Sequence, residues 1–314
     1  MRAVVTGAAG FIGSTLTDRL LAEGHEVVAV DNFDDYYSGK MRFLRRHLEN
    51  ERFRLLEIDI LDLDALRKSF EGADVVFHMA AQAGVRISVR DPLKAHHANT
   101  TGTLHVLLAA RDAGVRRVIN SSSSSVYGNA VRLPAREEDP TVPISPYAAS
   151  KLAAEHYCRL FHSLYGLDSV SLRYFTVYGP RQRPDMAIRT FTDRALDGKR
   201  PQIYGDGEQT RDFTFITDVV DAIMRCADCP DLKGAPLNIC SGSTVSVNQV
   251  VHAILKTVGR EDITPEHLPP QPGDVDHTWG DNTRARELLE WEPRVGIEEG
   301  LARFIEWYRT VGRA

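Results

Sequence analysis

A tyrosine and a lysine four positions apart are the residues best suited to proton transfer. Tyr147 and Lys151 follow Pro146 near the start of a segment with helical spacing. On a helix, this spacing places the phenol and the ammonium on one face. A free phenol with a pKa near 10 is only about 0.1% ionised at pH 7, and a neighbouring cation favours the phenolate. Such a tyrosine can take a proton from a hydroxyl while a hydride leaves the same carbon.

The same spacing occurs a second time, so the pattern alone is not specific. Tyr36 and Lys40 are also four residues apart, with Ser38 and Gly39 between them. These two residues predict a loop, in which no helix aligns the side chains. We therefore favour Tyr147 as the catalytic base, although an exposed helix start would give the same pattern.

A run of serines supplies a third candidate group. The run Ser121–Ser125 begins at the end of the expected strand Arg116–Ser121 and is followed by Val126, Tyr127 and Gly128. In parallel sheets, ligands bind beyond the carboxyl ends of the strands, where hydroxyls can donate to and accept from them. A serine-rich surface loop is the alternative.

Three glycines near the N-terminus predict a dinucleotide site. Gly7, Gly10 and Gly13 lie between a β-branched run and an amphipathic helix, with Asp31 at the end of the next strand. Backbone N–H groups at such a turn, together with the helix N-terminus, bind a pyrophosphate. The acidic residue accepts both ribose hydroxyls and repels a 2′-phosphate, which favours NAD over NADP. A tight turn with a helix cap is the alternative.

These residues need a framework, and strand and helix patterns alternate along the chain. The expected strands are Arg2–Thr6, Glu26–Val30, Phe53–Ile58, Asp74–His78, Arg116–Ser121 and Asp168–Arg173. The expected helices are Phe11–Ala22, Pro92–Ala113, Pro146–Tyr165, Thr217–Ala227, Val247–Val258 and Ile297–Arg309. The pattern predicts an α/β fold with a doubly wound, mostly parallel sheet and a smaller mixed C-terminal substrate lobe. We expect the dinucleotide domain at 1–176 and the lobe at 177–314, with segments near 208–238 returning to the first domain.

Composition excludes several classes of protein. The 314 residues carry a net charge of −5, and 43% are hydrophobic, as in an ordinary globular chain. No apolar run reaches the roughly 20 residues that span a bilayer, and the acidic balance argues against nucleic acid as a partner. The N-terminus shows no secretory signal, so we expect a cytoplasmic protein. Cys226 and Cys229 form a lone C-x-x-C, for which buried thiols are favoured over a metal site.

Together, the glycines, Asp31, Ser123, Tyr147 and Lys151 resemble the extended short-chain dehydrogenase/reductase superfamily over nearly the whole chain. More narrowly, the chain resembles NAD-dependent nucleotide-sugar epimerases, above all the UDP-glucuronic acid 4-epimerases. The motifs that carry the narrower resemblance are His78–Arg86, Ser121–Gly128 and Arg173–Met186.

The resemblance implies a role for each matched residue. Tyr147 would be the base, Ser123 the active-site hydroxyl, and Lys151 the partner that also binds the nicotinamide ribose. Asp59 and Ile60 would lie at the adenine edge. The other expected cofactor contacts are Gly7, Gly10, Phe11, Ile12, Gly13, Asp31, Asn32, Ala80, Ala81, Gln82, Asn99, Ser121, Tyr174 and Val177.

Substrate contacts follow from the same resemblance. Arg211 matches the arginine that contacts the diphosphate, and Asp274 the aspartate that contacts the uridine ribose. Thr176 stands where UDP-galactose 4-epimerases usually carry Asn. Gln271 departs from the pattern, because galactose-type epimerases have a second phosphate-binding arginine there.

Two serines indicate which reaction the chain performs. The 4,6-dehydratases carry Asp-Glu where this chain has Ser124 and Ser125, and uronate decarboxylases carry Glu at the second position. With Thr176, these hydroxyls could bind a C6 carboxylate. Three arginines, Arg181, Arg183 and Arg189, surround the turn after Gln182, and Arg183 is our candidate near an anionic sugar. A solvated loop is the alternative.

The predicted reaction is NAD-dependent C4 epimerisation of UDP-glucuronic acid to UDP-galacturonic acid through a transient 4-keto sugar. Epimerisation of UDP-glucose and UDP-galactose is one alternative. A non-catalytic dinucleotide sensor is another, although such proteins typically lack the tyrosine–lysine pair. Resemblance also implies a homodimer through Pro92–Ala113 and Pro146–Tyr165, whose apolar positions could equally face the protein's own sheet.

Overall fold

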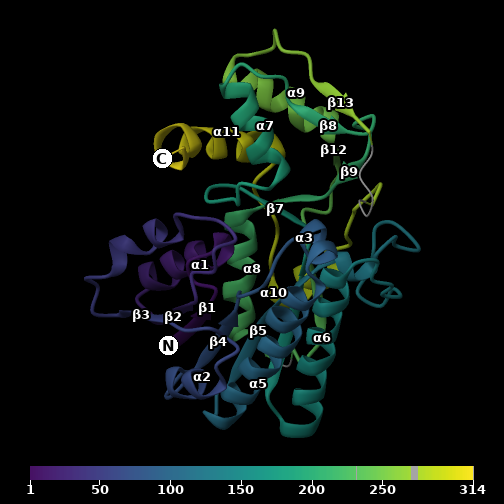
Figure 1. Ribbon diagram of the computed structural model, residues 1–314. Helices are drawn as coiled ribbons and strands as arrows, with labels where there is room; N and C mark the ends of the chain where they lie inside the picture. The colour runs from purple at the N-terminus through teal and green to yellow at the C-terminus, as the bar shows by residue number, and fades with distance from the viewer. Residues whose placement is uncertain (231, 270–274, 314) are drawn as a thin grey trace.

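A seven-stranded parallel sheet is the centre of the molecule, as Figure 1 shows. The computed structural model describes residues 1–230, 232–269 and 275–313. The strand order is β11–β6–β5–β4–β1–β2–β3. The bounds are β1 Arg2–Thr6, β2 Glu26–Asp31, β3 Phe53–Glu57, β4 Val75–His78, β5 Arg117–Ser123, β6 Asp168–Tyr174 and β11 Pro236–Ile239. This order confirms the predicted doubly wound α/β fold, and it reverses between β1 and β4, where such sheets bind ligands.

Helices cover both faces of the sheet because successive strand residues point to opposite sides. Ala3 and Val5 of β1 pack in one apolar cluster with α1 (Phe11–Ala22) and α8 (Ile216–Asp228). Val4, between them, belongs to the cluster on the other face. The helices of that face are α2 Leu63–Ser69, α5 Gly102–Asp112 and α6 Pro146–Tyr165. The crevice at the carboxyl ends of the strands is therefore held between two packed layers.

The long helix α6 has the bounds that the sequence predicted. Its N-cap is Ser145, whose hydroxyl accepts a hydrogen bond from Ala148 N at 3.1 Å, and Pro146 follows at the first helical position. Gly166 ends the helix in the left-handed conformation. Cap, proline and terminal glycine are the local signals that fix a helix in register. They fix where Tyr147 and Lys151 lie.

The predicted helix over Pro92–Ala113 is interrupted. The structure divides it into α4 (Pro92–His96), a π-turn at His97–Thr101 and α5. A π-turn fits an extra residue into one turn, which apolar spacing alone does not reveal. This turn carries Asn99, and Thr103 donates to the Asn99 carbonyl at 2.6 Å.

Elements from the second half of the chain form a smaller lobe beyond the sheet. Figure 1 shows α7 (Ala187–Leu196), α9 (Val247–Val258) and α11 (Ile297–Trp307) gathered above the strands. Three two-stranded sheets pair β7 with β10, β9 with β12 and β8 with β13. Their bounds are β7 Thr176–Tyr178, β8 Gln202–Tyr204, β9 Thr210–Arg211, β10 Phe213–Phe215, β12 Val245–Ser246 and β13 Glu266–Leu268. The remaining helices are α3 Val85–Arg90 and α10 Thr283–Leu289.

Features outside the crevice offer little chemistry. Cys226 and Cys229 are buried, and burial raises the pKa of both thiols. Within residues 1–230, 232–269 and 275–313, no three acidic, histidine or cysteine side chains gather as a metal would require. Over the same ranges, no helix combines the length and apolar character needed to cross a bilayer.

Candidate active site

A cavity of about 920 Å³ lies at the carboxyl edge of the sheet. Its wall combines the glycine loop, the serine run, the start of α6 and the first residues of β7. Nearly every predicted site residue lines it. Those brought together are Gly7, Gly10, Phe11, Ile12, Gly13, Asp31, Asn32, Asp59, Ile60, Ala80, Ala81, Gln82, Ser121, Ser123, Ser124, Ser125, Tyr147, Lys151, Tyr174, Thr176, Val177, Arg183 and Arg211. Asn99 is not in the wall, while Asp274 and Gln271 fall outside the described residues.

The dinucleotide loop has no room for side chains at two glycines. A Cβ on Gly7, whose φ is 67°, would lie 2.6 Å from the backbone of Ala80. A Cβ on Gly13 would lie 2.1 Å from the Gly7 carbonyl oxygen. The turn between β1 and α1 can therefore be this tight only with glycine. It leaves the bare backbone facing the cavity, as a pyrophosphate requires.

Asp31 is fixed by backbone donors on both carboxylate oxygens. Ala9 N donates to Oδ2 at 2.9 Å and Phe33 N donates to Oδ1 at 2.8 Å. Burial raises the pKa of Asp31, and these two N–H groups oppose the shift. Each oxygen keeps a lone pair for a ribose hydroxyl. A 2′-phosphate would instead meet a buried carboxylate, so the residues present fit NAD.

Asn99 acts from behind the cavity wall. Its side chain is fully buried, accepts from Gln82 N at 2.8 Å and donates to the Gln82 carbonyl at 3.0 Å. It also donates to Ser150 Oγ on α6 at 2.9 Å. The structure thus gives Asn99 a positioning role, joining the segment after β4 to the catalytic helix.

Tyr147 reaches the cavity with Ser123 as its hydrogen-bond partner. Burial raises the pKa of the Tyr147 phenol, and the Ser123 hydrogen bond and the Arg183 charge both oppose the rise. The sequence predicted that Lys151 itself lowers the pKa of the Tyr147 phenol, and the structure shows a different arrangement. The groups of the chain that favour the phenolate are Ser123 and Arg183, because the lysine is directed elsewhere.

Lys151 joins α6 to β5. Its ammonium donates to the Ser121 carbonyl at 2.6 Å, and only 2% of the residue is exposed. Burial lowers the pKa of Lys151 to about 8, against the charges of Cys158 and Glu155, which raise it. A cation is thus held against the end of β5 at a point that water barely reaches.

Hydroxyl groups line the wall opposite the glycine loop. Ser123 Oγ donates to Ser125 Oγ at 3.0 Å and accepts from Ser125 N at 3.2 Å. Ser124, Ser125 and Thr176 face the same cavity. No carboxylate stands among these positions, so the acid and base that a dehydratase needs at Ser124 and Ser125 are missing.

The three arginines of the 179–189 segment are paired rather than solvated. Arg183 forms a two-point ion pair with Asp185, with N–O distances of 3.0 and 3.1 Å. Arg181 pairs with Asp18 of α1, and Arg189 donates to the Gln182 carbonyl at 3.1 Å. The alternative that these arginines lie in a solvated loop is therefore wrong. Of the three, Arg183 is the one that faces the cavity.

Sequence reasoning undervalued Tyr36. Tyr36 lies in a loop as expected, whereas Lys40 begins a 3-10 helix (Lys40–Phe43), and both residues line the cavity. Tyr36 donates to Asp185 at 3.0 Å, and its ring lies 5.8 Å from the Arg183 guanidinium. Both contacts cross about 150 residues of sequence, and only the fold brings them together.

Arg211 stands at the lobe side of the cavity. Its guanidinium donates to the Val275 carbonyl at 2.7 Å and to the Asp276 carbonyl at 3.0 Å. These contacts tie β9 to the segment after the predicted uridine contact. A diphosphate placed here would meet Arg211 at the rim.

The chain matches the GDP-mannose 4,6-dehydratase family over residues 4–304. It belongs to this family. A UDP-glucose 4-epimerase of Mycolicibacterium smegmatis is 44% identical over 99% of both chains. A UDP-glucuronate 4-epimerase of Thermodesulfobacterium geofontis is 40% identical over 97% of this chain and 95% of its own length. This match and these relatives confirm the predicted membership of the extended short-chain dehydrogenase/reductase superfamily.

A solved structure of this family is closely similar. The UDP-glucuronic acid 4-epimerase of Bacillus cereus, a Tyr-to-Phe variant with UDP-4-deoxy-4-fluoro-glucuronic acid and NAD, superimposes with a TM-score of 0.94. It is 35% identical, over 99% of this chain and all of its own. At this similarity the two chains share the whole fold.

Replacing Lys151 with methionine is expected to change how stability depends on pH. Folding lowers the lysine pKa from 10.5 to about 8, so between these values the unfolded chain binds more protons. The stability of the original protein relative to Lys151→Met should therefore rise with pH in this window, by at most about 1.4 kcal/mol per unit. Urea unfolding of both proteins across the window measures it. A difference that stays constant would contradict the buried, shifted lysine.

Proposed function

We propose that the chain inverts C4 of UDP-glucuronic acid to give UDP-galacturonic acid. The coarser part of this function, an NAD-dependent UDP-sugar 4-epimerase of the isomerase class, follows from the family and its named relatives. The finer part of the proposal is the choice of a uronate as the substrate. One observation carries it: the hydroxyls of Ser124, Ser125 and Thr176 line the same cavity as Arg183 and Tyr147.

The acid–base work falls to Tyr147 and Ser123. Bound NAD supplies the acceptor and donor of the C4 hydride. Tyr147, hydrogen-bonded to Ser123, takes the proton of the C4 hydroxyl and later returns it. The Arg183 charge favours the phenolate. Inversion requires the 4-keto sugar to present its other face, and Arg211 supports this as an anchor for the diphosphate.

The sugar carboxylate is assigned to the hydroxyl wall. Hydrogen bonds from Ser124, Ser125 and Thr176 to an anion are charge-assisted, and about twice as strong as neutral ones. Arg183 lines the same cavity, but Asp185 balances its charge, so the preference rests on the hydroxyls. A neutral C6 hydroxyl would gain only the weaker, neutral hydrogen bonds.

A firmly held carboxylate also protects the intermediate. Oxidising C4 of a glucuronate gives a β-keto acid, which loses CO₂ readily. Loss of CO₂ moves the carboxylate electrons into the ring, and hydrogen bonds that localise charge on the carboxylate resist this movement. The hydroxyl wall thus supports epimerisation over decarboxylation.

UDP-glucose is the second candidate substrate, because a relative with that name is 44% identical. Proton NMR of the purified protein with UDP-glucuronic acid, and in parallel with UDP-glucose, decides between them. We expect a C4 epimer from the uronate without added reductant. Epimer from UDP-glucose alone would keep the reaction type and overturn the uronate, and a pentose product would mean decarboxylation.

Tyr147→Phe should reduce kcat by at least about 10³-fold, since it removes the proton acceptor and leaves the ring. Tyr36→Phe is the matched control, because Tyr36 also lines the cavity but contacts Asp185. Product formation by NMR, normalised to folded protein, measures both variants. Near-normal turnover of Tyr147→Phe would be fatal to the assigned base.

The double variant Ser124→Ala/Ser125→Ala should raise the ratio of pentose to epimer, because the carboxylate loses two of its donors. The ratio is read by NMR from the same reactions, so a general loss of activity does not affect it. An unchanged ratio would show that these hydroxyls do not protect the intermediate.

A further inference from the structure

The catalytic helix carries a third buried polar residue on its active face. Tyr147, Lys151 and Glu155 follow one another at four-residue spacing on α6, so their side chains lie on one side of the helix. Glu155 is only 1% exposed. A carboxylate that deep is costly unless it is fully paired. Its partners therefore show what it does.

Glu155 is paired with the serine strand and with β6. Its Oε1 accepts from Ser122 Oγ. Arg173, itself only 2% exposed, donates to Oε1 at 2.9 Å and to Oε2 at 2.7 Å. Both oxygens are thus held in a planar two-point contact, the geometry that gives a buried ion pair its strength.

Three consecutive serines of β5 each meet one of these α6 residues. Ser123 is the hydrogen-bond partner of Tyr147, and the Ser121 carbonyl accepts from Lys151. Ser122 lies between them and donates to the carboxylate one turn farther along the helix. The helix and strand are therefore joined at three successive points. The mechanism uses the contacts of Ser123 and Ser121, and the contact of Ser122 is left over.

We propose that Glu155, with its charge balanced by Arg173, is a positioning residue that holds α6 in register with β5 and keeps Lys151 an ammonium. The effect on turnover rests on the proposed function, whereas the effect on Lys151 does not. Glu155 touches no reacting atom, so its action is exerted through Ser122 and Lys151.

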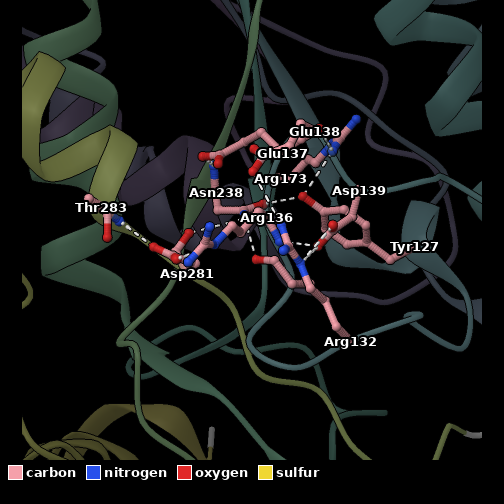
Figure 2. Close-up of polar contacts among 11 residues, drawn as sticks. Tyr127, Arg132, Arg136, Glu137, Glu138, Asp139, Arg173, Asn238, Asp281 and Thr283 are labelled. Carbon is pink, nitrogen blue, oxygen red and sulfur yellow. Dashed lines mark hydrogen bonds and ion pairs between the residues drawn. The ribbon is translucent and has the colours of Figure 1, made fainter.

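Further hydrogen bonds hold the Arg173 guanidinium in place. Arg173 donates to Tyr127 Oη at 2.8 Å and to the Glu137 carbonyl at 3.2 Å. Tyr127 in turn donates to Asn238 Oδ1 at 2.7 Å. Figure 2 shows these groups converging on one point from the connection before α6 and from β11. Arg173 thus has one fixed position from which to balance the carboxylate.

The charges around Lys151 agree with this role. Burial lowers its pKa to about 8, and Glu155 and Cys158 oppose the shift. His78 on β4 stays neutral because burial, with a smaller effect of Lys151, lowers its pKa to about 3. Tyr174 on β6 stays protonated, because burial raises its pKa. Burial likewise raises the pKa of the Cys158 thiol to about 12, so this thiol is uncharged near neutral pH.

The test is an NMR titration of Lys151 in protein containing ¹³C-labelled lysine, without substrate. The chain has seven lysines, and the Lys151 signal is the one lost in Lys151→Arg. Glu155→Gln leaves the Arg173 charge unbalanced and should lower the Lys151 pKa by about one unit or more. Glu155→Gln/Arg173→Met removes both charges and should restore it to within about half a unit. No shift in the first variant, or no restoration in the second, would overturn the charge role.

Asp168→Asn is the matched control. Asp168 pairs with buried Arg117 between the same two strands, but at their opposite ends. Its loss should destabilise the protein and leave the Lys151 titration unchanged. A shift equal to that of Glu155→Gln would reveal a general effect of loosening the sheet.

Ser122→Ala tests the positioning role and guards against failure of Glu155→Gln to fold. It removes a small hydroxyl and no charge, so we expect kcat to fall about tenfold, with KM and the Lys151 titration unchanged. Full activity would overturn the positioning role. If Ser122→Ala loses activity but the unmodified protein turns over another nucleotide sugar, the uronate proposal fails and this one stands.

Discussion

The hydrogen bond from the Lys151 ammonium to the Ser121 carbonyl is the contact on which the site depends. It joins the catalytic helix to the central strand, and a helix held only by apolar packing could slide along that strand. Because the donor is buried and charged, breaking the bond would strand an ammonium away from water. Tyr147 is one turn before Lys151, so fixing the lysine also fixes the phenol against Ser123.

Strand order explains why the cofactor and substrate sites meet at this contact. β4 lies between β1, which leads into the glycine loop, and β5, which carries the serines. Their carboxyl ends form one edge, where Gly7 approaches Ala80 so closely that no Cβ fits. The second half of the chain completes the site from above. Tyr36 and Arg183 meet around Asp185, so the segment after β2 holds the segment before α7 at the cavity wall.

Local signals made much of this arrangement predictable. The proline of α6 and the strand–turn–helix around Gly7 are local features of the sequence, and the bounds predicted for these elements are correct. The interruption of the helix at His97–Thr101 was missed, because one inserted residue hardly disturbs apolar periodicity. Tyr36 was set aside because no helix aligns it with Lys40, and its contact with Asp185, 149 residues away, has no local signal. The ion pair between Glu155 and Arg173 could not be predicted either, because nothing near either residue in the sequence indicates its partner.

The arginine pairing also constrains how the substrate is chosen. Arg183 is already balanced by Asp185, so a neutral sugar bound beside it would not leave this charge unpaired. Preference for a uronate must then arise from hydroxyl donors whose hydrogen bonds strengthen when the acceptor is charged. Such preference is a matter of degree, because a sugar hydroxyl can also accept from Ser124 and Ser125. Small changes in such a hydroxyl wall can therefore move the preference of the site between the two sugars.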